Sequence, residues 1–204
     1  MDYSQHKILE FRRKFLVLVG AQINIADPQN DKTIGFIRMK AWKLKEDVRL
    51  STDESQSQEV FRIHARNVID FGGTYDVFDS NTNQQLFTLR RKGLKSSFVR
   101  DHWDILDNNG NAIGDVQETS KGLAFVRRWL EIIPVVGPFI DLALAFAPQT
   151  YSITVNGKQV AGITHRKNPF IVKMSLDRSM DQDNTDPRIS MAATSLLSII
   201  DASK

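Results

Sequence analysis

Short alternations of apolar and polar residues recur along the chain, and polar turns separate them. The pattern is clear at residues 75–89 (YDVFDSNTNQQLFTL), 103–116 (WDILDNNGNAIGDV) and 151–164 (YSITVNGKQVAGIT), with a fainter copy at residues 23–37. Alternation with a period of two places every second side chain on one face of a strand, so these segments are expected to be half-buried. The repeat therefore predicts four β-hairpins.

Turn residues lie at the centre of each copy. The pairs Asn109-Gly110 and Asn156-Gly157 predict two-residue hairpin turns, because both central residues of such a turn take positive φ. Glycine also recurs early in the second strand of three copies, where it indicates a bulge or a close approach of another backbone. These glycines are Gly35, Gly114 and Gly162.

Four further segments complete the β pattern. Residues 47–52 and 60–66 predict another pair of strands, and residues 97–100 and 170–176 predict single strands. The total is about ten to twelve short strands at regular spacing, which is typical of a barrel or a sandwich.

Two segments have helical character instead. Residues 122–149 are a mostly apolar insert that predicts two short helices, one ended by Pro134 and one that opens after Pro138. Residues 186–202 predict a helix with Asp186 as N-cap and Pro187 as its first residue. No charged residue occurs from Ile189 to Ile200, so we expect this helix to be buried in the protein.

A series of β-hairpins followed by one apolar C-terminal helix resembles the tubby-like barrel of tubby domains, phospholipid scramblases and LURP-one-related proteins. The amino-acid sequence is most similar to the LURP-one-related family at residues 75–79 (YDVFD), 89–118 and 168–177 (NPFIVKMSLD). The resemblance implies one domain over residues 1–204. It implies a mainly β fold, a closed antiparallel barrel of about twelve strands around a buried C-terminal helix.

Composition removes several classes of function. The absence of cysteine excludes a disulfide framework, thiolate metal sites and a cysteine nucleophile. The net charge of +3 is too small to argue for nucleic-acid binding. The sequence has no nucleophile elbow, Walker loop or dinucleotide motif, and no two histidines have metal-ligand spacing. We therefore expect a non-enzymatic protein without a nucleic-acid partner.

The sequence does not predict a membrane-spanning helix. The longest apolar run, residues 132–147, contains two prolines, a glycine and Asp141, and it is shorter than the roughly 20 residues of a spanning helix. We expect a cytoplasmic chain that contacts a membrane peripherally.

A basic cluster follows the second hairpin. The resemblance implies an anionic-lipid site there, because tubby domains bind phosphoinositide headgroups through basic residues. The alternative is a charged loop that prevents a sheet edge from pairing with other chains. The cluster consists of Arg90, Arg91, Lys92, Lys95 and Arg100.

The insert offers a second contact surface. Basic and Trp residues beside apolar ones are typical of helices at a membrane interface, but the same surface could pack on the barrel or form a homodimer contact. The candidate contact residues are Arg127, Arg128, Trp129, Val135, Phe139, Leu142 and Phe146.

Three carboxylates precede the C-terminal helix. Asp181, Asp183 and Asp186 alternate with amide residues, as the oxygen ligands of a Ca²⁺ site do. Scramblases have a similar acidic segment at this place. The alternative is a solvated loop in which Asp186 caps the helix.

These features favour a protein that docks on anionic phospholipid through basic loops and the apolar insert. The alternative is a protein-interaction module that uses the insert as a partner or dimer surface. Lipid scrambling, implied only by the likeness to scramblases, ranks below both.

Overall fold

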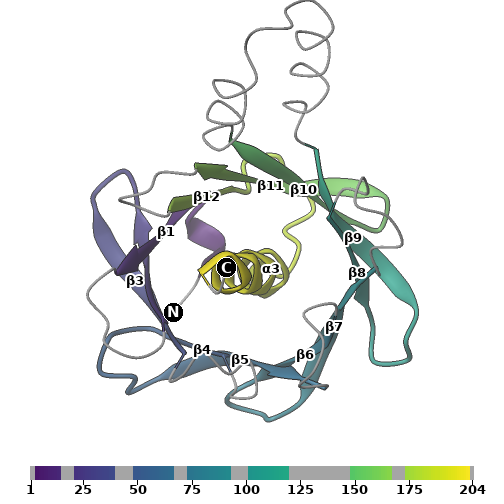
Figure 1. Ribbon diagram of the computed structural model, residues 1–204, viewed down its shortest axis with the longest axis horizontal. Coiled ribbons are helices and arrows are strands. Elements are labelled where there is room, and N and C mark those ends of the chain that lie inside the picture. Colours follow the sequence, from purple (N-terminus) through teal and green to yellow (C-terminus); the bar gives the residue numbers. More distant parts are fainter. Residues whose placement is uncertain are drawn as a thin grey trace, which may run out of the picture.

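A computed structural model describes residues 3–14, 21–39, 48–66, 73–92, 101–119, 148–166 and 173–202. Twelve strands form a closed barrel in which each strand pairs antiparallel with the next along the chain, and β1 pairs with β12. Helix α3 lies inside the ring of strands (Figure 1). The predicted fold, mainly β with a closed barrel around a C-terminal helix, is confirmed.

The described elements begin with a short 3-10 helix, η1, and end with α3. Their bounds are η1 Tyr3–Gln5, β1 Ile8–Lys14, β2 Ala21–Asp27, β3 Lys32–Met39, β4 Val48–Ser51, β5 Glu59–Ala65, β6 Thr74–Asp79, β7 Gln85–Arg91, β8 His102–Leu106, β9 Ala112–Glu118, β10 Gln149–Val155, β11 Lys158–Arg166, β12 Lys173–Asp177 and α3 Pro187–Ala202. Strand β1 has no counterpart among the predicted strands, and the predicted strand at residues 97–100 lies outside the described residues.

Each of the five hairpins has a β-bulge just after its turn. In each second strand one extra residue has no partner in the register. A bulge bends a strand and increases its twist, and both effects help to close a sheet into a barrel. The extra residues are Ile34, Val60, Leu86, Ile113 and Val160.

The predicted glycine positions are explained in part by these bulges. Gly35 and Gly114 directly follow the extra residue of their strands. At Gly114 a Cβ atom would lie 2.2 Å from the Thr154 carbonyl oxygen, so only glycine permits this close approach of β9 and β10. Gly162 has no such contact, since the nearest atom would be 3.8 Å from its Cβ.

The two Asn-Gly pairs form different turns. Asn156 and Gly157 have φ of 50° and 76° and join β10 directly to β11, as predicted. The prediction for Asn109-Gly110 is wrong, because Asn109 does not have the positive φ that a two-residue turn of this type requires. Gly110 N–H donates to the Asp107 carbonyl at 3.0 Å, and Asp107 N–H donates to Asn111 at 2.9 Å. The Asp107 carboxylate also accepts from the backbone of Asn109 and Asn111, which stabilises this longer loop.

Helix α3 provides the centre of the core. Most of its described side chains, including Met191, Leu196 and Ile199, are buried against the barrel wall. Its buried hydroxyls donate to carbonyls one turn earlier, for example Thr194 to Ser190 at 2.8 Å and Ser195 to Met191 at 2.7 Å. These hydrogen bonds pair the buried hydroxyl groups of α3 within the apolar interior. The prediction of a buried C-terminal helix is confirmed.

The order of the strands gives the barrel two different ends. Because neighbouring strands are antiparallel, the five hairpin turns all lie at one end, here called the hairpin end. The link from β12 to α3 begins at this same end. The strand ends at the opposite end, here called the connection end, are those joined by residues 15–20, 40–47, 67–72, 93–100, 120–147 and 167–172.

Candidate functional site

Arginines and carboxylates are unevenly distributed between the two ends of the barrel, although both signs of charge occur at each end. Four of the five second strands of the hairpins terminate in arginine at the connection end: Arg38 near the end of β3, Arg66 just after β5, Arg91 in β7 and Arg166 in β11. The hairpin end has mainly carboxylates in its turns and in the link to α3. These are Asp27, Asp31, Asp53, Glu54, Asp79, Asp107, Asp181, Asp183 and Asp186.

Exposed cations gather at the connection end, and we name this set the basic rim. All of its members have exposed side chains on the strands or directly beside them. They come from four hairpins that are far apart in the sequence, and barrel closure brings them to one end. The basic rim consists of Arg38, Arg66, Arg90, Lys92 and Arg166.

Part of the rim is built on a buried carboxylate. Asp104 of β8 accepts from Arg90 at 3.1 Å and pairs with Lys92 at 2.8 Å. Burial acts to raise the pKa of Asp104, but the hydrogen bonds from Lys92 and Arg90 outweigh it and lower the pKa below its ordinary value. Arg90 and Lys92 thus share the carboxylate of Asp104, and a second carboxylate, Asp115, lies opposite Asp104 in the register of β8 and β9.

Arg66 is held in a similar way. Its guanidinium makes two bonds, of 2.6 and 2.8 Å, to the carboxylate of Asp76, which also accepts from the Thr88 hydroxyl. Asp76 and Asp104 are largely buried on the outer wall, at 7% exposure each. They position Arg66 and Arg90 while the side chains of these arginines remain about half exposed.

The residues of the predicted basic cluster point in different directions, because successive side chains of β7 alternate between the two faces of the barrel wall. Arg90 and Lys92 point outward, but Arg91 pairs with Trp103 in the register and points toward the barrel interior. The Arg91 guanidinium lies 5.5 Å from the centre of the Trp103 ring and donates to Asp101 at 2.6 Å. Arg91 therefore does not belong to the exposed rim. Lys95 and Arg100 lie outside the described residues.

The predicted insert, residues 122–149, lies outside the described residues except at its end, where its predicted bound is wrong because Gln149 is the first residue of β10. Residues 120–147 are not described, so the contact predictions for Arg127, Arg128, Trp129, Val135, Phe139, Leu142 and Phe146 stay predictions. The described strands β9 and β10 that flank these residues both meet them at the connection end.

The three carboxylates predicted for Ca²⁺ are each bonded to a different cation. Asp181 pairs with Arg178 at 3.1 Å, Asp183 with Lys158 at 2.7 Å, and Asp186 with Arg188 at 2.6 Å. Within the described ranges no group of three or more carboxylate, histidine or cysteine side chains is arranged to hold a metal ion.

Asp186 has the capping role that the alternative interpretation predicts. Its carboxylate accepts from the Arg188 backbone N–H at 2.9 Å. Asp181, in contrast, is not part of a solvated loop, since its side chain is 1% exposed.

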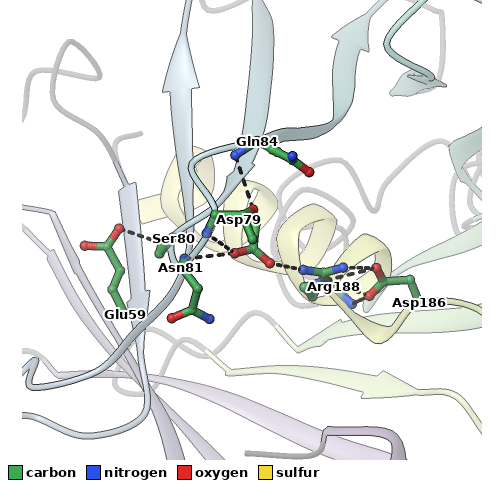
Figure 2. Close-up of polar contacts among 8 residues, drawn as sticks. Glu59, Asp79, Ser80, Asn81, Gln84, Asp186 and Arg188 are labelled. Atoms are coloured by element: carbon green, nitrogen blue, oxygen red, sulfur yellow. Dashed lines mark hydrogen bonds and ion pairs between the residues drawn. The ribbon is translucent and has the colours of Figure 1, made fainter.

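A cavity of about 250 Å³ lies at the hairpin end, between the start of α3 and the turns of two hairpins. Arg188 lies at its wall and binds both Asp186 and Asp79, the last residue of β6 (Figure 2). Hydrogen bonding to Asp186 raises the pKa of Arg188, while backbone donors in the turn lower the pKa of Asp79. Glu59 accepts from the Ser80 hydroxyl at 2.7 Å. The bonds from Arg188 to Asp186 and to Asp79 connect the start of α3 to strand β6 of the barrel.

Sequence reasoning missed three members of the rim: Arg38, Arg66 and Arg166. Each comes at the end of the second strand of a hairpin, as Arg90 and Arg91 do. The signal was therefore present in the repeat itself, but only barrel closure shows that these positions share one end.

None of the described helices is long and apolar enough to cross a membrane.

Comparison with known proteins places the chain in a family. A search of the curated proteins finds no significant match, and a search of the solved structures finds none either. Residues 33–193 match the profile of a family described as LURP-one-related. The match runs from β3 into α3 and includes most of the chain, so the chain belongs to the LURP-one-related family.

Proposed function

We propose that this protein is a non-enzymatic lipid-binding protein that docks peripherally on anionic membranes with its connection end. The observation that carries the proposal is the set of exposed cations, the basic rim, that barrel closure brings to the connection end, while the turns of the hairpin end are rich in carboxylates. An anionic surface attracts the rim and repels the hairpin end, so the charge distribution also orients the barrel.

The strength of the attraction is sufficient for reversible docking. Each basic residue near an anionic bilayer contributes about 1 kcal/mol, and the rim presents five exposed cations. Asp76 and Asp104 offset part of this charge. Salt screens the attraction beyond a distance of about 8–10 Å at physiological ionic strength, so binding is expected to weaken as salt is raised.

The apolar insert supports the same orientation. Strand β9 ends and strand β10 begins at the connection end, and residues 120–147 connect these two strands in the sequence. Apolar side chains such as Val135, Phe139, Leu142 and Phe146 would add burial in the interface that salt does not screen. We expect binding to retain a component that persists at high salt.

A pair of matched variants tests the orientation. Arg38→Gln with Arg166→Gln removes two cations from the rim, and Lys32→Gln with Lys158→Gln removes two cations from the hairpin end. Co-sedimentation with phosphatidylserine-containing vesicles should weaken about tenfold or more in the first variant, because roughly 2 kcal/mol of attraction is lost. The second variant should bind within about twofold of the wild type.

Three controls complete the test. Vesicles of phosphatidylcholine alone should bind neither variant nor the wild type through the rim. Replacing residues 135–147 by a short polar link should remove the component that resists salt and leave β10, which begins at Gln149, intact. Absence of binding to anionic vesicles by the unaltered protein would contradict the proposal and direct attention to a protein partner of the insert.

A further inference from the structure

Three arginines stand side by side across the outer wall of the barrel. In the strand register Arg38 of β3 lies opposite Arg49 of β4, and Arg49 lies opposite Arg62 of β5. Their sequence neighbours Ile37, Leu50 and Ile63 are fully buried in the core, so the arginines point outward. We name Arg38, Arg49 and Arg62 the arginine row.

Such a row is unfavourable for the fold alone. Like charges directly opposite each other on neighbouring strands are destabilising. Among the described residues, Glu59 is bonded to the row through Arg49 Nη1 at 3.2 Å. The register therefore gathers three guanidinium groups on a small area of the wall, where one anion can contact more than one of them.

Two of the guanidinium groups are held in place by neighbours. Arg62 lies over the ring of Phe78, 5.3 Å from its centre, and donates to Asn83 Oδ1. Arg49 is held by Glu59, while 53% of its side chain is exposed. A held guanidinium loses less conformational freedom when it binds an anion, and its fork of N–H donors matches the oxygens of a phosphate.

We propose that the arginine row is a binding site for an anion with two or more adjacent phosphate groups. Opposite residues on neighbouring strands have Cβ atoms about 5 Å apart, so one phosphate engages one or two members of the row. An anion with several phosphates can engage all three. The phosphates can belong to a lipid headgroup or to a soluble molecule. As a headgroup site, the row rests on the proposed function and specifies the lipid class within it.

Calorimetric titration of the full chain with sodium tripolyphosphate and with orthophosphate tests the site. Tripolyphosphate should bind at least about tenfold more tightly than orthophosphate, because it engages more guanidinium groups. Arg49→Gln, at the centre of the row, should weaken tripolyphosphate binding about tenfold. Arg49→Lys should give an intermediate loss, since it retains the charge but lacks the fork.

Arg12→Gln is the matched control. It removes the same charge from the outer wall at β1, outside the row and the rim. This variant should bind tripolyphosphate within about twofold of the wild type. Equal losses in the Arg12 and Arg49 variants would overturn the site, because they would show dependence on net charge alone. Thermal unfolding of each variant confirms that it is folded, and Arg62→Gln provides a second test within the row.

Vesicles distinguish the two sources of phosphate and separate this inference from the proposed function. Competition by tripolyphosphate against vesicles that contain a bisphosphorylated lipid, lost in Arg49→Gln, would assign the row to a headgroup. Row-dependent tripolyphosphate binding without vesicle binding would assign it to a soluble anion and contradict membrane docking. Vesicle binding that is indifferent to Arg49, without tripolyphosphate binding, would overturn the row and leave the membrane proposal standing.

Discussion

Arg178 and Asp181 form an ion pair that is almost sealed from solvent, with side chains 4% and 1% exposed. Arg178 also donates to the carbonyls of Thr185 and Tyr3, and Asp181 accepts from the Thr185 backbone and hydroxyl. The pair joins the N-terminal segment, the end of β12 and the link to α3. A buried pair of this kind is costly to break, because the remaining charge loses its partner without regaining water.

Asp181→Ala should therefore lower the free energy of unfolding by about 3–5 kcal/mol. The matched control is Asp183→Ala, whose carboxylate is 54% exposed and pairs with Lys158 on the surface. That change should cost less than about 1 kcal/mol, since solvent screens exposed pairs. Urea denaturation measures both values, and similar losses in the two variants would show that Arg178 does not depend on Asp181.

At the scale of the secondary-structure element, four hairpin turns are stabilised in the same way. Four turns begin with an aspartate whose carboxylate accepts hydrogen bonds from the residues that follow. These bonds favour the charged form and lower the pKa of the carboxyl group, most strongly at Asp53, where the hydroxyls of Ser55 and Ser57 lower it to about 2. The aspartates are Asp27, Asp53, Asp79 and Asp107.

Acid should consequently destabilise the barrel through its turns. A pKa that is lower in the folded state than the ordinary value of 3.8 contributes stability that is complete above pH 3.8. That contribution is lost as the pH falls toward 2. Melting temperatures measured from pH 6 to pH 2 should decline mainly below pH 4, and Asp53→Asn should make the decline shallower. An unchanged slope in this variant would show that Asp53 does not carry the effect.

The whole molecule is a barrel whose interior is filled by its own C-terminal helix. Leu197 of α3 is 6% exposed and lies beside Leu89, Trp103 and Val116 of the wall. Strands β1 and β12 close the ring around it, so residues from both ends of the chain contribute to one core. Packing of this kind makes the fold depend on the helix.

Leu197→Asp should abolish the cooperative fold, because an unpaired charge in this core costs several kcal/mol and typical domains have only 5–15 kcal/mol to lose. Leu197→Met, which keeps the volume and the apolar character, should cost less than about 1.5 kcal/mol. Circular dichroism and size-exclusion chromatography report the outcome. A native-like melting transition in the Asp variant would show that the barrel does not need the helix in its interior.

Much of the fold was accessible from local patterns. The hairpins at residues 75–89, 103–116 and 151–164, the capped helix at 186–202 and the family resemblance were all predicted and are confirmed. Strand β1 was missed because its sequence, ILEFRRK, has several charged residues. It is a strand because β2 and β12 lie on both sides of it and supply its hydrogen bonds.

The candidate site was predicted only in part, for a related reason. Arg90 and Lys92 were identified from the sequence, but the inward direction of Arg91 depends on the register with β8. Asp181 looked solvated because the sequence does not show that the chain folds back so that Arg178 and Thr185 both bind its carboxylate and that Arg178 also reaches the Tyr3 carbonyl.

The sequence by itself determined the hairpins, the turn aspartates, the helix cap and the family, because alternation, turn chemistry and capping act between residues a few positions apart. Only the tertiary structure decided which charges lie together. The basic rim joins strand ends from residues 38 to 166, and the arginine row joins three strands through their register. Coulomb interactions depend on distance in space, and closure of the barrel sets those distances.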